Sequence, residues 1–219
     1  VRPVWQSVKM LALLGTLLLA TNAYAQGRPD IVWMRGGHGT SAAIAFSPDG
    51  SLIASGSNDG TIKLWRPTDG KLVRTMLSNA GTVAFSPDGG LLASGSDDGT
   101  IRLWRVSDGR LLYTLRRHTN AVRSVAFSPD GIYLASGAVD RTVRLWRVSN
   151  GTLIRTIAGH TDTVSSVAFS PSGNFLASGS LDGTVKFWSV PNGALARTLS
   201  DLIEVTSIAF SPDGRLLAV

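Results

Sequence analysis

Short apolar runs alternate with turn-forming residues along most of this chain. Between His118 and Ile157 the apolar runs are separated by SPDG, by a turn containing Asp140, and by SNG. Pro suits the second position of a tight turn and Gly the fourth, and Asp-Gly between apolar runs is a strong hairpin signal. The pattern predicts four strands in this stretch, at about residues 122–127, 133–137, 142–147 and 153–157.

The same unit recurs through the sequence. Steps of 39, 42, 42 and 41 residues separate the turn blocks that begin at Ser47, Ser86, Ser128, Ser170 (as SPSG) and Ser211. A period near 40 with four strands per unit is typical of a β-propeller blade rather than of a helical repeat. We therefore predict an all-β propeller of four-stranded antiparallel blades, with about four and a half blades in this sequence.

These residues resemble the WD-repeat (tryptophan-aspartate repeat) β-propellers over about residues 31–219. In that family a His before the first strand, a Ser on the second, an Asp in the second turn and a Trp on the third form a buried hydrogen-bonded set. The resemblance implies four such sets here: His38, Ser55, Asp59 and Trp65; Ser94, Asp98 and Trp104; His118, Ser136, Asp140 and Trp146; and His160, Ser178, Asp182 and Trp188. The second set lacks its His, which predicts a looser blade edge. Each of these Trp residues is followed by Arg or Ser instead of the Asp in the family name.

The last repeat contains only two predicted strands before Val219. Each blade of a propeller buries its faces against two neighbours, so an open array exposes apolar faces. We expect the sequence to be a fragment of a longer propeller of about seven blades. Assembly of two such chains is the alternative.

The first 25 residues differ from the rest. Arg2 and Lys9 precede a short apolar run, and Ala23-Tyr24-Ala25 follows it. This order is typical of a secretory signal peptide at residues 1–25. A membrane anchor is the alternative, but the run is shorter than the roughly 20 residues that a bilayer requires. Residues 26–37 are expected to form a linker and a first strand that closes the ring, and residues 38–219 the blades. The predicted location is periplasmic or extracellular, as in an exported bacterial protein, with no stable membrane span after cleavage.

The charge of the chain is +6 and it has no cysteine, which excludes disulfides and thiolate metal sites. Basic residues recur with the repeat, at Lys63, Arg102, Arg144 and Lys186 and at Arg74, Arg155 and Arg197. They could form a belt for an anionic partner or protect outer strand edges against aggregation. We favour edge protection and predict no nucleic-acid binding.

The polar residues predict no catalytic, metal or cofactor site. The His residues occur one per blade, whereas a metal site needs ligands that converge on one point. The Ser, His and Asp residues recur as sets in several blades, which catalysis does not require. No glycine-rich loop joins a strand to a helix, so nucleotide binding is unsupported.

The resemblance implies a rigid, non-enzymatic platform that binds a protein or peptide partner. The expected contact positions, which we call the rim, lie in the loops before the first strands and in the second turns: Ala42, Asn58, Gly81, Asp97, Ala121, Arg123, Val139, Thr163, Ser165 and Leu181. Arg123 is the first candidate, because Arg is enriched among residues that dominate interface energy. The main alternative is an accessory propeller of an enzyme whose catalytic part lies beyond Val219. A propeller that is itself a hydrolase is a weaker one.

Overall fold

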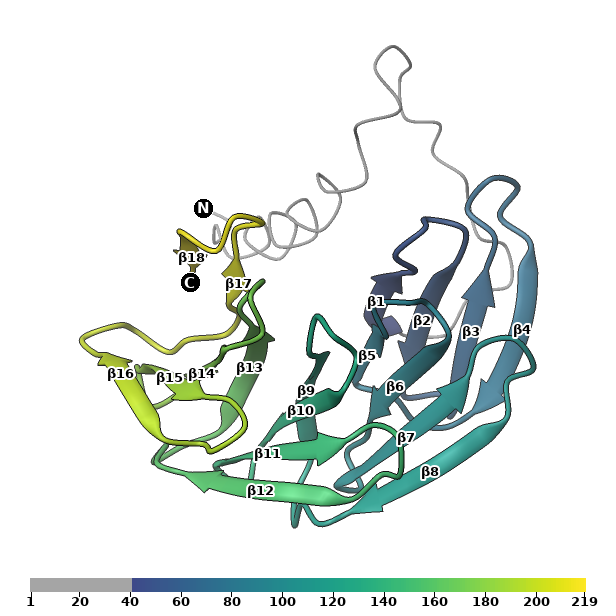
Figure 1. The fold of residues 1–219 in the computed structure, drawn as a ribbon. Coiled ribbons are helices and arrows are strands. Elements are labelled where there is room, and N and C mark those ends of the chain that lie inside the picture. Colours follow the sequence, from purple (N-terminus) through teal and green to yellow (C-terminus); the bar gives the residue numbers. More distant parts are fainter. Residues whose placement is uncertain (1–40) are drawn as a thin grey trace, which may run out of the picture. The chain divides into compact units, whose positions relative to one another are not determined.

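The computed structural model describes residues 41–219, and the regular structure in this range consists of β-strands (Figure 1). Within this range no helix is long enough and apolar enough to cross a membrane. The strands form four sheets of four strands and one sheet of two, and every pair of neighbouring strands is antiparallel. The predicted fold class, an array of four-stranded antiparallel blades, is confirmed.

Each four-stranded sheet is built from four consecutive strands. The first blade contains β1 (Ser41–Phe46), β2 (Ile53–Ser57), β3 (Thr61–Trp65) and β4 (Leu72–Leu77). The second contains β5 (Thr82–Phe85), β6 (Leu91–Gly95), β7 (Thr100–Arg105) and β8 (Leu111–Arg116). The third contains β9 (Val122–Phe127), β10 (Tyr133–Ala138), β11 (Thr142–Arg147) and β12 (Leu153–Ala158), so two of its predicted strands extend one residue further than expected. The fourth contains β13 (Val164–Phe169), β14 (Phe175–Ser180), β15 (Val185–Ser189) and β16 (Leu195–Leu199), and β17 (Ala209–Phe210) and β18 (Leu217–Ala218) follow it.

The first turn of each blade is closed by its own side chains. In the third blade the Gly131 N–H donates to the Ser128 carbonyl over 2.9 Å, and the Ser128 hydroxyl donates to Asp130 Oδ1 over 2.5 Å. Asp130 Oδ1 also accepts the Ile132 N–H over 2.9 Å. Gly131 has a φ of 70°, a left-handed conformation that favours glycine. The SPDG block is therefore a self-contained reversal.

The second turn needs the same left-handed conformation. Gly60, Gly99 and Gly183 have φ values of 85°, 76° and 76° at this position. The third blade places Arg141 there instead, with a φ of 67°. A side chain in this region costs about 1 to 2 kcal/mol relative to a right-handed residue. The third blade thus carries local strain that the other blades avoid.

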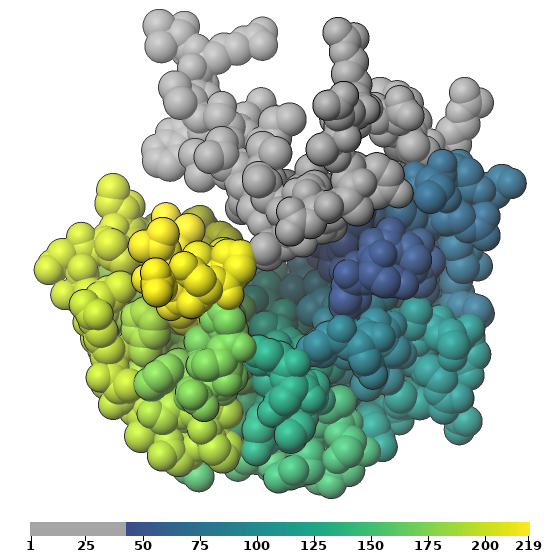
Figure 2. Space-filling model, turned by 45° about the horizontal axis from the view of Figure 1, so that its top comes forward, coloured from purple at the N-terminus to yellow at the C-terminus, as the bar shows by residue number. Residues whose placement is uncertain are grey.

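Neighbouring blades meet through the first strand of each sheet. Figure 2 shows the blades side by side in successive colours. Gly137 on β10 permits the close approach, since an added Cβ would lie 2.6 Å from Val164 Cγ1 on β13. The Val167 N–H donates to Ser124 Oγ of the preceding blade over 3.1 Å. Both faces of a sheet are covered by its neighbours, which explains the small and apolar residues on both sides of the second strands.

The apolar core lies between blades. Leu145 of β11 is buried in a cluster that includes Trp188 from the next blade. The corresponding side chain of the fourth blade, Phe187, is only partly buried and packs edge-on against Phe210 of β17. A third-strand Trp from one blade therefore completes the core of the blade before it.

Candidate partner-binding rim and its buried hydrogen-bond network

A chain of hydrogen bonds crosses the third blade. The Trp146 indole N–H on β11 donates to Ser136 Oγ on β10 over 2.9 Å. Ser136 Oγ lies 2.7 Å from His118 Nε2, and His118 Nδ1 lies 2.8 Å from Asp140 Oδ2 in the second turn. The structure thus brings together the four residues that the resemblance grouped in this blade, and they tie the loop before β9 to both central strands.

Along this network of four side chains, each donor fits the next acceptor. The indole donates to the Ser136 hydroxyl, the hydroxyl donates to His118 Nε2, and the Nδ1–H donates to Asp140. Burial lowers the pKa of His118 below its ordinary value, and the hydrogen bond and charge of Asp140 offset this only in part. His118 is therefore neutral at pH 7 and carries its proton on Nδ1.

Asp140 connects three segments. Its carboxylate accepts the Thr142 hydroxyl over 2.7 Å, the Thr142 N–H over 3.1 Å and the Thr119 N–H over 3.1 Å, in addition to His118. Burial raises the pKa of Asp140, but these donors, together with the hydrogen bond from His118 and the charge of its ring once protonated at acid pH, lower it more, and the net pKa lies below its usual range. The ionised carboxylate is thus the acceptor that holds the second turn against the loop before β9.

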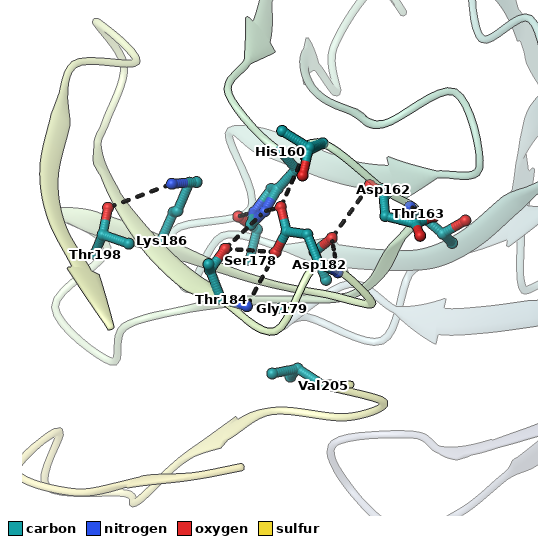
Figure 3. Close-up of polar contacts among 12 residues, drawn as sticks. His160, Asp162, Thr163, Ser178, Gly179, Asp182, Thr184, Lys186, Thr198 and Val205 are labelled. Carbon is teal, nitrogen blue, oxygen red and sulfur yellow. Dashed lines mark hydrogen bonds and ion pairs between the residues drawn. The ribbon is translucent and has the colours of Figure 1, made fainter. Parts of the chain in front are cut away.

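The fourth blade repeats the arrangement, and Figure 3 shows His160 between Ser178 and Asp182. The two ring contacts measure 2.7 and 2.9 Å, and the Trp188 indole donates to Ser178 Oγ over 2.8 Å. Burial raises the pKa of Asp182, but donors from Thr184, Thr161 and the ring outweigh it and lower the pKa to about 2. The network is therefore a property of the repeat.

The first two blades keep the indole contact. Trp65 and Trp104 donate to Ser55 and Ser94 over 2.8 and 3.0 Å. The contacts of Asp59 include the Thr61 N–H over 2.9 Å, and His38 lies outside the described residues.

In the second blade, which lacks the His, an arginine links the second turn to the loop before the first strand. Arg102 donates to Asp98 Oδ2 and to Ser78 Oγ, each over 3.2 Å. Burial raises the pKa of Asp98, but the hydrogen bonds from Thr100, Ser96 and Arg102 lower it to about 2. The Asp98 side chain is 50% exposed, against 7% for Asp140. The looser edge of this blade stays a prediction, and the greater exposure of Asp98 supplies a physical reason for it.

The Ser, His and Asp geometry resembles that of a nucleophilic triad, but the Ser136 hydroxyl cannot meet a substrate. Ser136 is 0% exposed, and its oxygen already accepts the Trp146 indole N–H. Attack on a carbonyl would need a free lone pair and an open site. Within residues 41–219, no three His, Asp or Glu side chains lie close enough together to hold a metal ion. The network is suited to holding loops in place.

The rim residues differ in how much surface they present. Asn58, Asp97 and Arg123 are exposed, and five others are half-buried: Gly81, Val139, Thr163, Ser165 and Leu181. The side chain of Ala42 lies outside the described part of the structure.

Two rim candidates require correction. Ala121 is 5% exposed, and its own carbonyl accepts the Val139 N–H over 2.9 Å, so its side chain is not available to a partner. The Ser165 hydroxyl contacts the Gly179 carbonyl over 3.0 Å and also the Val205 carbonyl, so it is used internally.

Arg123 and Asp97, two of the rim candidates, form an ion pair with each other. Arg123 Nη1 on β9 lies 3.1 Å from Asp97 Oδ1 in the second turn of the preceding blade, and both side chains are about half exposed. The pair thus joins two blades at the rim. Sequence reasoning named both residues but missed the contact, because the register between blades is not contained in the repeat.

The basic belt is partly internal. Arg74 on β4 donates to the carbonyls of Asp108 and Ser107, over 2.9 and 3.0 Å, in the third turn of the next blade. In the second blade Tyr113 takes this position, and its hydroxyl donates to the Ser149 carbonyl over 2.9 Å. Arg74 therefore ties one blade to the next.

Comparison with known proteins agrees with this geometry. The family described as the IFT122 first β-propeller matches residues 79–219. The chain belongs to the WD-repeat β-propeller family. The WD domain, G-beta repeat, matches residues 31–66 of this WD-repeat chain.

Single repeats of the WD-repeat chain resemble curated proteins. It is 54% identical over 37 residues to the serine-threonine kinase receptor-associated protein of Gallus gallus, and the matched segment covers 17% of this chain and 11% of that protein. It is 52% identical over 40 residues to the small ribosomal subunit protein RACK1y of Oryza sativa subsp. japonica (18% and 12%) and 59% identical over 34 residues to protein Mut11 of Chlamydomonas reinhardtii (16% and 9%). The matched segments thus span about a tenth of each relative.

Proposed function

We propose that this WD-repeat chain is a non-enzymatic scaffold that binds a protein or peptide partner through its rim. Members of the family typically serve as protein-interaction scaffolds. The observation that carries the proposal is the contrast between a constant framework and a variable surface. The third and fourth blades share the same hydrogen-bond network, whereas Arg123 and Val139 are replaced by Ser165 and Leu181 at matching positions.

Variation at these positions is compatible with the fold, because packing does not determine them. The network fixes the loop before the first strand and the second turn, so the exposed groups next to it are held in defined positions. Binding groups that are already ordered lose less conformational freedom when a partner binds. The framework therefore supports specific recognition by a few exposed side chains, with Arg123 first among them.

The test is selection of displayed peptides on the full chain, followed by affinity measurement with Arg123→Ala. We expect the selected peptides to bind at least tenfold more weakly to this variant, since truncation of a central interface Arg costs about 2 kcal/mol or more. Arg110→Ala is the matched control, because Arg110 is exposed in a third turn at the opposite end of the strands. Equal affinities for the wild type and both variants would contradict a role of the rim.

We further propose that the protein is exported, with residues 1–25 removed as a signal peptide. The support is the order of basic residues, apolar run and small residues, which lies outside the described residues. Expression of the full chain in a bacterium with N-terminal sequencing of the periplasmic and secreted fractions tests this. A product beginning at Gln26 is expected, and a full-length product in the membrane fraction would favour the anchor.

A non-enzymatic role is likewise part of the proposal. Its support is the burial of Ser136 and of the His118 ring within the network, which leaves neither group for chemistry. The full chain is assayed for hydrolysis of model ester and lactone substrates. Hydrolysis that is abolished only by substitutions at these Ser, His and Asp residues would contradict the non-enzymatic role.

A further inference from the structure

A groove of about 570 Å³ lies where the second blade meets the third. One wall follows the end of β8 and the residue after it, with Thr114, Arg116 and Arg117. The opposite wall and the floor contain Trp146, Gly151 and Leu153 of the third blade. The groove therefore combines an apolar base with two guanidinium groups on one side.

The two arginines are peculiar to this blade boundary. Strand register aligns Arg116 with Leu77, Ala158 and Ser200 of the other blades, and Arg117 with Ser78, Gly159 and Asp201. In the fourth blade an added Cβ at Gly159 would lie 2.9 Å from the Trp188 ring. The fold therefore does not require a long basic side chain at either position. At the position of Arg117, the next blade boundary has Gly159, which has no side chain.

The charge of the groove is uncompensated. Within the part of the chain that the structure describes, the guanidinium groups of Arg116 and Arg117 form no hydrogen bond and no ion pair, and both residues are exposed. Arg144 adds a third positive charge nearby, and its own burial and the charge of Arg117 lower its pKa while Asp140 raises it. The Asp140 carboxylate lies 3.8 Å from Arg144 and is already held by His118 and Thr142. A ligand carboxylate would thus meet two unengaged guanidinium groups.

We propose that this groove binds an acidic peptide segment of a partner protein. Guanidinium groups bind carboxylates through paired hydrogen bonds, and two adjacent arginines match two acidic side chains of an extended segment. An apolar side chain of the same segment packs against the half-buried Leu153 at the edge of the groove, where water is displaced. This inference rests on the proposed function as a protein-binding scaffold and adds the chemical class of one bound segment.

The experiment measures binding of fluorescein-labelled octaglutamate to the full chain by fluorescence anisotropy, with octaglutamine as the uncharged probe. The test variant is Arg116→Ala with Arg117→Ser, which introduces residues that other blades carry at these positions. We expect octaglutamate to bind the variant at least tenfold more weakly than the wild type, and octaglutamine to bind neither. Affinity should also fall as salt rises from about 20 to 150 mM, because the charges are exposed.

The charge-matched control is Arg155→Ser with Arg197→Ser, which removes two exposed arginines from β12 and β16. Circular dichroism melting must show all variants folded as the wild type is. An equal loss of affinity in the control would show general attraction to a basic protein and would overturn the proposal. No detectable binding of octaglutamate to the wild type would overturn it as well.

The peptides selected on the rim separate the two hypotheses. If their binding depends on Arg123 but octaglutamate fails to bind, the scaffold function stands and the groove is rejected. If octaglutamate binds through Arg116 and Arg117 while no peptide depends on Arg123, the groove stands and the rim is rejected.

Discussion

Replacing Asp140 with Ala tests the structural role of the network. The substitution removes the acceptor of four donors, among which His118 Nδ1 is fully buried. An unpaired buried donor costs about 1 to 3 kcal/mol, and each donor that water can reach loses at most about 1 kcal/mol. Since the two N–H groups lie near the surface, we expect the free energy of unfolding to fall by about 2 to 4 kcal/mol.

Asp98→Ala is the matched control for this experiment. Asp98 occupies the same turn position, but half of its side chain is exposed and no His depends on it. Its loss should cost about 1 to 2 kcal/mol, because Arg102 can bind water instead, whereas the Thr100 hydroxyl is buried and loses its acceptor. Urea unfolding followed by tryptophan fluorescence measures both variants, and Asp140→Asn should fall between wild type and Ala because it keeps one acceptor. Equal midpoints for the Asp140 and Asp98 variants would refute the reasoning.

Three further predictions follow from the same contacts. Folding lowers the pKa of His118 and His160 from 6.5, so the unfolded chain binds protons more readily than the folded chain. The free energy of unfolding should therefore be highest above pH 6.5 and decrease as the pH falls below it. A urea midpoint that stays constant between about pH 7.5 and 5 would contradict this. Arg141→Gly should stabilise the protein by roughly 0.5 to 1 kcal/mol, because relief of the left-handed residue exceeds the added chain entropy, and a lower melting temperature would show that the arginine side chain is needed. Ser136→Ala should cost about 2 to 4 kcal/mol by leaving the Trp146 N–H and His118 Nε2 unpaired, whereas a loss within about 0.5 kcal/mol would mean that water replaces the hydroxyl.

The features that sequence predicted well are local. The SPDG turns could be predicted because Ser128, Asp130 and Gly131 satisfy each other within a few residues. The strands follow from the turns, since the chain between two reversals has only one extended path. The third-blade network was also accessible, because its members keep the same spacing in the next repeat.

Contacts that depend on the register between blades could not be predicted. Arg123 on β9 pairs with Asp97 of the preceding blade, and Arg74 on β4 donates to two carbonyls in the third turn of the next blade. Ala121 was expected on the surface, but it is buried next to Val122, whose N–H donates to the Ser96 carbonyl of the preceding blade. A period in the sequence reports what each blade does within itself, whereas these contacts depend on where one blade meets the next.

The basic residues show how contacts within a blade can be distinguished from features that do not recur between blades. Two of those that recur with the repeat are used within the framework, since Arg102 pairs with Asp98 and Arg144 lies beside Asp140.

The third blade also carries three exposed arginines that do not recur, Arg117, Arg123 and Arg141, where the fourth blade has Gly159, Ser165 and Gly183. Arg141 is strained, Arg123 pairs with the preceding blade, and Arg117 borders the groove. Folding requires none of them, since the fourth blade forms the same network without them. Positive charge concentrated on one blade in this way is the feature of the surface that a partner can distinguish from the rest of the repeat.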